Sequence, residues 1–315
     1  MYYVGVDLGG TSIKAGIVDE KGYILKKASC PTGVERGHLA VMRDIAMLAK
    51  NLIEESAYGM ENFKAIGVGI PGVFNPKAGL IAMCTNLGWY DIPIIEPIQE
   101  IINLPVYVDN DATVAGVAES VSGVSAGIDN SIFLTLGTGV GAGIIINGKP
   151  YSGSHGAGSE LGHMIIQAEG GIPCSCGNVG CVDRYCSATT LIRDGKTSMA
   201  ENPNGALATR VGNDPEKITA KDVIDLAKEG DPECAAIFDR FIHYLCVTLV
   251  TIIHSFDPEI IVIGGGVSHA GQFLLDAIEK ELPTMPMYKT LPHANVVLAS
   301  LGNDAGIIGA AMLGR

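Results

Sequence analysis

The chain is short of positive charge. Its 315 residues include 21 Lys and Arg against 34 Asp and Glu, a formal net charge of -13, and the basic residues do not cluster. Because binding to a nucleic-acid backbone requires a basic surface, this balance argues against DNA or RNA as a partner. Charged residues make up only 17% of the chain and hydrophobic residues 47%. This composition is typical of a globular protein and excludes a disordered one.

Segments that direct a protein to export or into a membrane are also lacking. The start, MYYVGVDLGG, has no basic stretch and no cleavage site, so we expect no signal peptide. The longest apolar stretch, residues 241–256, is shorter than the ~20 residues that a membrane-spanning helix needs. We interpret it as part of a buried helix that begins at Asp231-Pro232, with Pro in the first turn. We therefore expect a cytoplasmic protein without a membrane partner.

Two familiar nucleotide-binding signatures are missing. No segment matches GxxxxGK[ST], and the GGGVS sequence does not match GxGxxG. Four Gly-rich turns nevertheless follow apolar runs, at residues 7–11, 69–72, 137–143 and 264–266. A single turn of this kind is often only a change of chain direction, but glycine also lets backbone N–H groups approach an anion closely. Two such turns facing each other could hold a polyphosphate.

A repeated design singles out two of those turns. Residues 3–27 and residues 132–150 both read as strand, Gly-Thr turn, strand and polar hairpin. The alternative is a coincidence between two Gly-rich segments, but the shared order of elements favours a duplicated unit. Strands alternate with helical patterns in the rest of the chain, which predicts an α/β protein of two related lobes. We expect residues 1–118 and a last helix at about 302–315 in the N-terminal lobe, and residues 119–301 in the C-terminal lobe.

Five of the eight Cys residues are scattered through apolar segments, as in a reduced cytosolic protein. The other three form a compact set with one histidine: His163, Cys174, Cys176 and Cys181. This set is complete for a tetrahedral structural zinc and leaves no position for a reactive water. A disulfide within the set is the alternative, although two of the cysteines are only two positions apart and could hardly pair. Glu160 and Asp183 flank the set and could bind a small hydroxylated ligand.

Three polar residues, Asp109, Asn110 and Asp111, stand where the strand LPVYVD meets a helical pattern. A helix N-cap would explain one of them, either Asn110 or Asp111. The carboxyl end of a strand is also where α/β proteins place their sites. A carboxylate held there could accept the proton of an attacking hydroxyl in phosphoryl transfer, and Asp111 is the candidate.

The motifs DLGGTSIKAG, GIPG, DNDA, LGTGVGAG, GSELGHM, CSCGNVGC and IIVIGGG follow one another along the whole chain. In this order they resemble the ROK family of sugar kinases, especially its bacterial glucokinases. The combination of ELGH with CSCGNVGC carries most of the specificity. The resemblance implies an α/β, actin-like ATPase (ribonuclease H-like) fold with two lobes around a cleft. It also implies ATP-dependent phosphorylation of a hexose, glucose first, with Mg²⁺ accompanying ATP and a homodimeric or homotetrameric assembly.

The resemblance also implies the residues of each site. The nucleotide would contact two phosphate loops and an adenosine loop: Asp7, Gly9, Gly10, Thr11 and Lys14; Gly137, Thr138 and Gly139; Gly264, Gly265 and Gly266. The sugar would contact a second set: Gly72, Asn86, Asn110, Asp111, Glu160, His163 and Asp183. Asp111 would be the general base, and Asp7 would lie near the Mg²⁺ through water. His163 would bind zinc through one ring nitrogen and present the other to the sugar.

One departure from the family pattern bears on the substrate. The family usually has Glu where this chain has Asp183. Asp has one methylene group fewer than Glu, so its carboxylate lies ~1.5 Å closer to the backbone. An N-acylhexosamine such as N-acetylmannosamine, fructose or mannose therefore stays open as the substrate. Regulators of the same family carry a DNA-binding segment before the first phosphate loop, and here that loop begins at Asp7. We therefore expect no such segment. Because Asp111 and both phosphate loops are present, we also expect an enzyme rather than a catalytically silent sugar sensor.

Overall fold

The computed structural model describes residues 1–315, which divide into two compact units. Unit 1 comprises Met1–Phe133, Gly143–Ser159 and Ala299–Arg315, and unit 2 comprises Leu134–Ala142 and Glu160–Leu298. Residue 118, the predicted end of the first lobe, lies inside helix α3 (Asp111–Ser122) of unit 1. The C-terminal helix α9 (Ala305–Met312) also belongs to unit 1.

Unit 1 is built on a five-stranded sheet with the order β3-β2-β1-β4-β8. Its strands are β1 (Tyr2–Leu8), β2 (Ser12–Asp19), β3 (Ile24–Pro31), β4 (Phe63–Ile70) and β8 (Val106–Asn110). The first three pair antiparallel, whereas β4 runs parallel to β1 and β8 parallel to β4. The register pairs Asp7 with Gly69, and Gly69 with Asp109. Because parallel strands end at the same edge of a sheet, the predicted first phosphate loop starts from the same edge as the Asp109–Asp111 segment. This loop, residues 7–11, is called the first phosphate turn below.

A second five-stranded sheet has the order β11-β10-β9-β12-β13. Its strands are β9 (Ser131–Leu136), β10 (Val140–Ile146), β11 (Lys149–Pro150), β12 (Ile260–Gly264) and β13 (Asn295–Leu298). Numbered within each sheet, both follow the order third, second, first, fourth, fifth. This agreement supports the duplicated unit that the two Gly-Thr turns predict. A small sheet completes the strands, with β5 (Val73–Asn75), β6 (Leu80–Cys84) and β7 (Trp89–Pro93).

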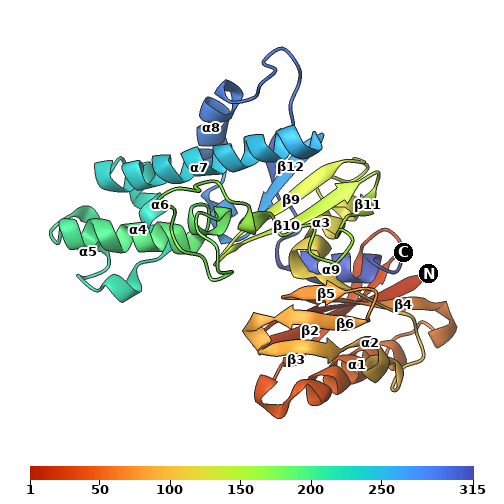
Figure 1. The fold of residues 1–315 in the computed structure, drawn as a ribbon. Coiled ribbons are helices and arrows are strands. Elements are labelled where there is room, and N and C mark those ends of the chain that lie inside the picture. Colours follow the sequence, from red (N-terminus) through yellow and green to blue (C-terminus); the bar gives the residue numbers. More distant parts are fainter. The chain divides into compact units, whose positions relative to one another are not determined.

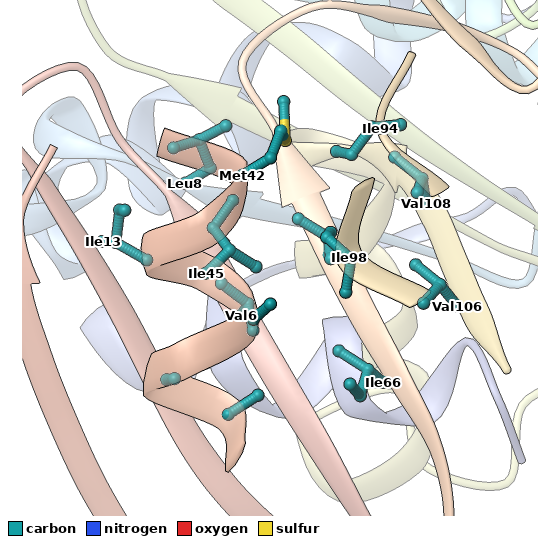
Figure 2. Close-up of a cluster of buried hydrophobic side chains, with 14 of the residues drawn as sticks. Val6, Leu8, Ile13, Met42, Ile45, Ile66, Ile94, Ile98, Val106 and Val108 are labelled. Carbon is teal, nitrogen blue, oxygen red and sulfur yellow. The ribbon is translucent and has the colours of Figure 1, made fainter. Parts of the chain in front are cut away.

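Helices α1 (His38–Glu54) and α2 (Ile95–Gln99) pack with the first sheet to form the main core of unit 1. The apolar residues of α1 recur at helical spacing, which turns Met42 and Ile45 inward, and both are fully buried. Figure 2 shows Ile45 close to Val6 of β1 and Met42 nearer Leu8, with Ile98 of α2 nearer the parallel strands. Burying one side chain of this size stabilises the fold by roughly 1.5–3 kcal/mol. The cluster thereby holds the strands that carry the candidate site.

Helix α9 lies against β1 and β4, the two central strands of the first sheet, and against α3 (Figure 1). Its backbone approaches the strands so closely that only glycine fits at two positions. A Cβ atom on Gly5 would lie 1.9 Å from the carbonyl oxygen of Ile307, and one on Gly67 would lie 1.6 Å from that of Ala310. Both distances are far inside van der Waals contact. The last helix of the chain is therefore an integral layer of unit 1.

The buried carboxylate of Glu119 ties the C-terminal segment to α3. Its side chain is 1% exposed and accepts hydrogen bonds from the backbone N–H groups of Ser300, at 2.8 Å, and Leu301, at 3.0 Å. It also accepts one from Val124 N–H at 2.9 Å. Several N–H donors compensate the cost of burying this group. Nothing in the sequence motifs pointed to Glu119.

Unit 2 contains five α-helices, of which α7 is the longest. They are α4 (Ala188–Glu201), α5 (Ala206–Arg210), α6 (Ala220–Glu229), α7 (Pro232–Phe256) and α8 (Gln272–Glu281). Asp231 caps α7, with Pro232 in its first turn, as the sequence predicts. By length and composition α7 could cross a membrane, but 56% of its most apolar stretch is buried. It packs against α4, α6 and α8, which confirms the predicted core helix (Figure 1).

The close approach of α9 predicts a strong effect of Gly67→Ala. The added methyl group collides with the Ala310 carbonyl, so the helix must move away from the sheet. We expect the free energy of unfolding to fall by about 1–3 kcal/mol. Gly10→Ala is the matched control, because a Cβ atom there meets nothing within 4 Å. Chemical denaturation of both variants checks this, and equal unfolding midpoints would contradict the role given to Gly67.

Candidate active site

The first phosphate turn follows β1 and is closed by backbone and side-chain hydrogen bonds. The N–H of Gly9 donates to the carbonyl of Ser12 at 3.0 Å. Thr32, which is fully buried, donates its hydroxyl to the Gly9 carbonyl at 2.7 Å and its N–H to the Thr11 carbonyl at 3.0 Å. Thr32, which follows β3, thus fixes the conformation of the predicted phosphate loop by these hydrogen bonds. No sequence motif indicated this role of Thr32.

Asp7 stands at the end of β1 in a mostly buried position. Burial raises the pKa of its carboxyl group, and the positive charge of Lys14, its partner in the β1–β2 register, lowers it in part. A Cβ atom on Gly306, in the first turn of α9, would lie 2.7 Å from the Asp7 carboxyl carbon. Because residue 306 is glycine, it does not collide with the carboxyl group of Asp7. A buried carboxylate of raised pKa is suited to a site that also receives a cation.

Asn110 and Asp111 begin helix α3 at the same sheet edge. The Asn110 side-chain oxygen accepts a hydrogen bond from the N–H of Ala112 at 2.8 Å, which makes Asn110 the N-cap. Its side-chain amide donates to the Gly72 carbonyl at 3.1 Å. The structure thus brings together Asn110 and Gly72, two residues predicted to contact the sugar. Asp111 is the first helical residue, and its carboxylate accepts from the N–H of Ala112 at 2.8 Å.

The neighbouring Asp109 is held from two sides. One carboxylate oxygen accepts from the N–H of Asn110 at 2.8 Å, and the other accepts from the hydroxyl of Ser152 at 2.9 Å. Burial raises the pKa of Asp109, and these two hydrogen bonds offset part of the rise. Both oxygens of Asp109 therefore accept hydrogen bonds within the fold.

Asn86 lies in a short 3-10 turn that follows β6. Burial raises the pKa of the nearby Cys84 thiol, and the negative charge of Asp111 contributes to the rise. The charge of Asp111 therefore acts on the end of β6, two residues before Asn86. The predicted sugar ligands of unit 1 are thus supplied by the ends of β4, β6 and β8.

The second phosphate turn, Gly137 to Gly139, connects β9 and β10 in unit 2. The N–H of Gly137 donates to the Gly139 carbonyl at 2.9 Å, which closes the turn. Asp183, predicted to bind the sugar, accepts a hydrogen bond through its carboxylate from the N–H of Val140 at 2.8 Å. The structure therefore places Asp183 against this turn.

The predicted adenosine turn follows β12 and packs on the end of β9. Gly265 has a φ of 81°, and a Cβ atom there would lie 2.7 Å from backbone atoms of Leu136. Glycine is required at this position on both counts. Gly264 ends β12, and Gly266 begins a short 3-10 turn. Since Leu136 directly precedes Gly137, the adenosine turn and the second phosphate turn adjoin within unit 2.

The predicted metal ligands form one cluster in unit 2. The ligand atoms of His163, Cys174, Cys176 and Cys181 all lie within 4.8 Å of one another. The Cys176 and Cys181 sulfurs are 3.6 Å apart, and the Cys174 sulfur is 3.7 Å from His163 Nδ1. A covalent disulfide needs ~2.05 Å. Zinc–sulfur bonds of ~2.3 Å in a tetrahedron imply sulfur–sulfur distances of ~3.8 Å. The donor set therefore fits a zinc ion and not a disulfide.

The backbone around the cluster explains its two glycines. Gly177 and Gly180 have φ values of 92° and 77°, a left-handed conformation that favours glycine. A Cβ atom on Gly180 would also lie 1.8 Å from the Gln167 carbonyl oxygen. The N–H of Cys174 donates to the Asn178 carbonyl at 2.8 Å, which closes the knuckle. The backbone of this loop thus brings the four candidate ligands together.

Comparisons with known proteins agree with this geometry. The model of the ROK family matches residues 3–315. The glucokinase of Halalkalibacterium halodurans is 36% identical to this chain, over 99% of the chain and 94% of its own length. The crystal structure of a ROK family glucokinase from Streptomyces griseus in complex with glucose and AMPPNP has a TM-score of 0.81 and 32% identity, covering 99% of both chains.

A second solved structure, the ROK hexokinase from Thermus thermophilus, has a TM-score of 0.86 and 30% identity, covering 99% of this chain and 97% of its own. The two five-stranded sheets share one strand order, as expected for the two related lobes of an actin-like ATPase. Both the resemblance and the α/β fold that the motifs predict are confirmed. This protein belongs to the ROK family and has its actin-like ATPase (ribonuclease H-like) fold.

Proposed function

We propose that this protein transfers the γ-phosphoryl group of ATP to the 6-hydroxyl of glucose, yielding ADP and glucose 6-phosphate. The observation that carries the proposal is the shared sheet edge of Asp7, Gly69 and Asp109, from which the first phosphate turn and Asp111 begin. The similarity to a curated glucokinase at 36% identity, and to a glucokinase crystallised with glucose and AMPPNP, supports glucose and ATP as the ligands.

Asp111 acts as the general base in this proposal. It would accept the proton of the 6-hydroxyl as the oxygen forms its bond to the γ-phosphorus and the bond from phosphorus to ADP breaks. Its position is set by the first turn of α3 and by the cap at Asn110. The Asn110 amide uses one N–H on the Gly72 carbonyl, and an amide nitrogen has a second N–H to offer a sugar hydroxyl.

The phosphates of ATP would be bound by the backbone N–H groups of the two Gly-Thr turns, with Lys14 adding positive charge. The adenosine would lie along the turn Gly264–Gly266. Asp7 would hold Mg²⁺ through water, and the ion supplies charge neutralisation to the transferred group. Its presence would also favour the charged form of Asp7, whose pKa burial raises.

The cluster of His163 and three cysteines would hold a structural zinc ion. The His163 Nδ1 atom is the ring nitrogen that approaches Cys174, so Nε2 would remain for a sugar hydroxyl. Glu160 directly precedes the 3-10 turn Leu161–His163, and its carbonyl accepts from the N–H of His163 at 3.0 Å. From family membership we further propose a cytoplasmic protein that assembles as a homodimer or homotetramer.

Removing one thiol tests the zinc site. Cys176 is exposed, so Cys176→Ser changes the cluster without opening a cavity in the core. We expect the variant to lose its bound zinc and to melt at a lower temperature, because metal binding contributes to the stability of the fold. Cys30→Ser, outside the cluster, should keep both. Elemental analysis and thermal unfolding of the two proteins decide this, and equal zinc contents would contradict the assignment.

Asp111→Asn tests the base. The amide cannot accept the hydroxyl proton, so kcat should fall by about 100-fold or more while the KM for glucose changes little. Asp225→Asn, which removes an exposed carboxylate paired with Lys221, is the control and should be neutral. A coupled assay for ADP measures both. Turnover near that of the unaltered protein would exclude Asp111 as the base.

The substrate is tested with a panel of glucose, mannose, fructose and N-acetylmannosamine in the same assay. We expect the highest kcat/KM with glucose, as the similarity to glucokinases supports. A clear preference for one of the other three sugars would replace glucose as the substrate and would leave the mechanism at Asp111 unchanged.

A further inference from the structure

The carboxylate of Asp183 packs on the backbone of the second phosphate turn. Its Oδ1 atom accepts from the N–H of Val140 at 2.8 Å, and a Cβ atom on Gly139 would lie only 2.5 Å from the same oxygen. Asp183 comes two residues after the metal ligand Cys181 and 43 residues after Val140. The contact therefore joins the metal-binding segment to a turn that is distant in sequence.

Two further hydrogen bonds from the same segment reach the same turn. The N–H of Ala188 donates to the Gly137 carbonyl at 2.8 Å, and the hydroxyl of Thr189 donates to the Thr138 carbonyl at 2.6 Å. Both donors lie in the first turn of α4. We call the three residues that hold the turn, Asp183, Ala188 and Thr189, the loop clamp.

The segment that carries the loop clamp is itself held together. Ser187 donates its hydroxyl to the Asp183 carbonyl at 2.8 Å and caps α4 by accepting from the N–H of Thr190 at 3.3 Å. The Ser187 side chain thus joins the 3-10 turn Val182–Arg184, which contains Asp183, to the start of α4. The loop clamp is therefore one unit and not three separate contacts.

The loop clamp determines which way the peptide groups of the turn face. A trans peptide is planar, so its C=O and N–H point in opposite directions. The clamp binds the carbonyls of Gly137 and Thr138, and the N–H groups of Thr138 and Gly139 consequently face away from it. N–H groups fixed in this way need no rearrangement when they bind an anion.

The metal cluster touches the same turn from its other end. A Cβ atom on Gly162, the neighbour of His163, would lie 2.0 Å from the Val140 carbonyl oxygen. Val140 is thus contacted by Gly162 at one end of the ligand set and by Asp183 at the other. A rigid cluster would hold both contacts at a constant separation.

We propose that Asp183, with Thr189, is a positioning residue of the second phosphate turn and acts on the binding of ATP rather than on the binding of the sugar. The proposal rests on the proposed function for the identity of the nucleotide. It differs from the role of sugar ligand that the resemblance implies for this position. The short side chain of Asp reaches Val140, whereas the carboxylate of Glu would need to shift by about one bond length to do so.

The test compares Asp183→Ala, Asp183→Asn and Thr189→Val with Thr197→Val. Thr197 also lies in α4 and donates its hydroxyl to a carbonyl, that of Arg193, at 3.2 Å, so it is a matched control away from the turn. Losing one clamp bond should weaken ATP binding about fivefold to tenfold. We expect this for Asp183→Ala and Thr189→Val, with glucose KM unchanged. Asp183→Asn retains an acceptor oxygen and should lose less.

Isothermal titration with Mg-ATP and steady-state KM values for ATP and glucose give the readouts. A rise in glucose KM for Asp183→Ala, with ATP binding intact in both Asp183→Ala and Thr189→Val, would overturn the proposal and make Asp183 a sugar ligand. Asp183→Glu adds a second criterion, because a positioning role leaves the ranking of sugars unchanged. Thr189 is partly exposed, so its variant tests the clamp even if changes at Asp183 impair folding.

The titration also separates this proposal from the proposed function. If the unaltered protein binds Mg-ATP but phosphorylates no hexose, the proposed function is wrong. The affinities of the four variants for Mg-ATP then still test the loop clamp. If the unaltered protein does not bind Mg-ATP, the clamp has no nucleotide to act on and this proposal is overturned. Equal affinities for all four variants would overturn it as well.

Discussion

The contact between the backbone of α9 and the two central strands of the first sheet is the constraint on which unit 1 depends. Gly5 and Gly67 allow it, because any side chain at either position would overlap a carbonyl oxygen of the helix. The same helix supplies Gly306, which leaves room for the carboxyl group of Asp7. The packing that joins the chain's last helix to its first strand therefore also shapes the end of β1, where the first phosphate turn begins.

Hydrogen bonds between side chains and backbone then fix the conformation of the turns at the ends of the strands. Thr32 holds the first phosphate turn, and Asn110 caps α3 while contacting the Gly72 carbonyl. The loop clamp holds the second turn from Asp183 and Thr189. In each case a group from one element fixes the peptide planes of another, and fixed peptide planes are what anion binding by backbone N–H groups requires.

Elements with a local signal were predicted well. The apolar spacing of α1, the Asp231-Pro232 start of α7 and the cap at Asn110 depend on residues within a few positions of one another. The candidate metal ligands could be recognised from the sequence because three of the four lie within eight residues, from Cys174 to Cys181. The repeated Gly-Thr turn predicted that the two five-stranded sheets are related, and their shared strand order agrees with this. The signal is local because a strand and its hairpin partner are neighbours in sequence.

The sequence by itself determined the family and the α/β class, and it singled out the two Gly-Thr turns and the Cys/His cluster, because each is written in a short motif. The tertiary structure alone decided which distant groups those motifs meet. Glu119 binds Ser300, 181 residues away, and Asp183 binds Val140. Such pairs leave no periodic or spacing signal, since their distance depends on how whole elements pack. For that reason the contact between Asp183 and the turn before Val140 could not be predicted from the sequence, and only the fold shows it.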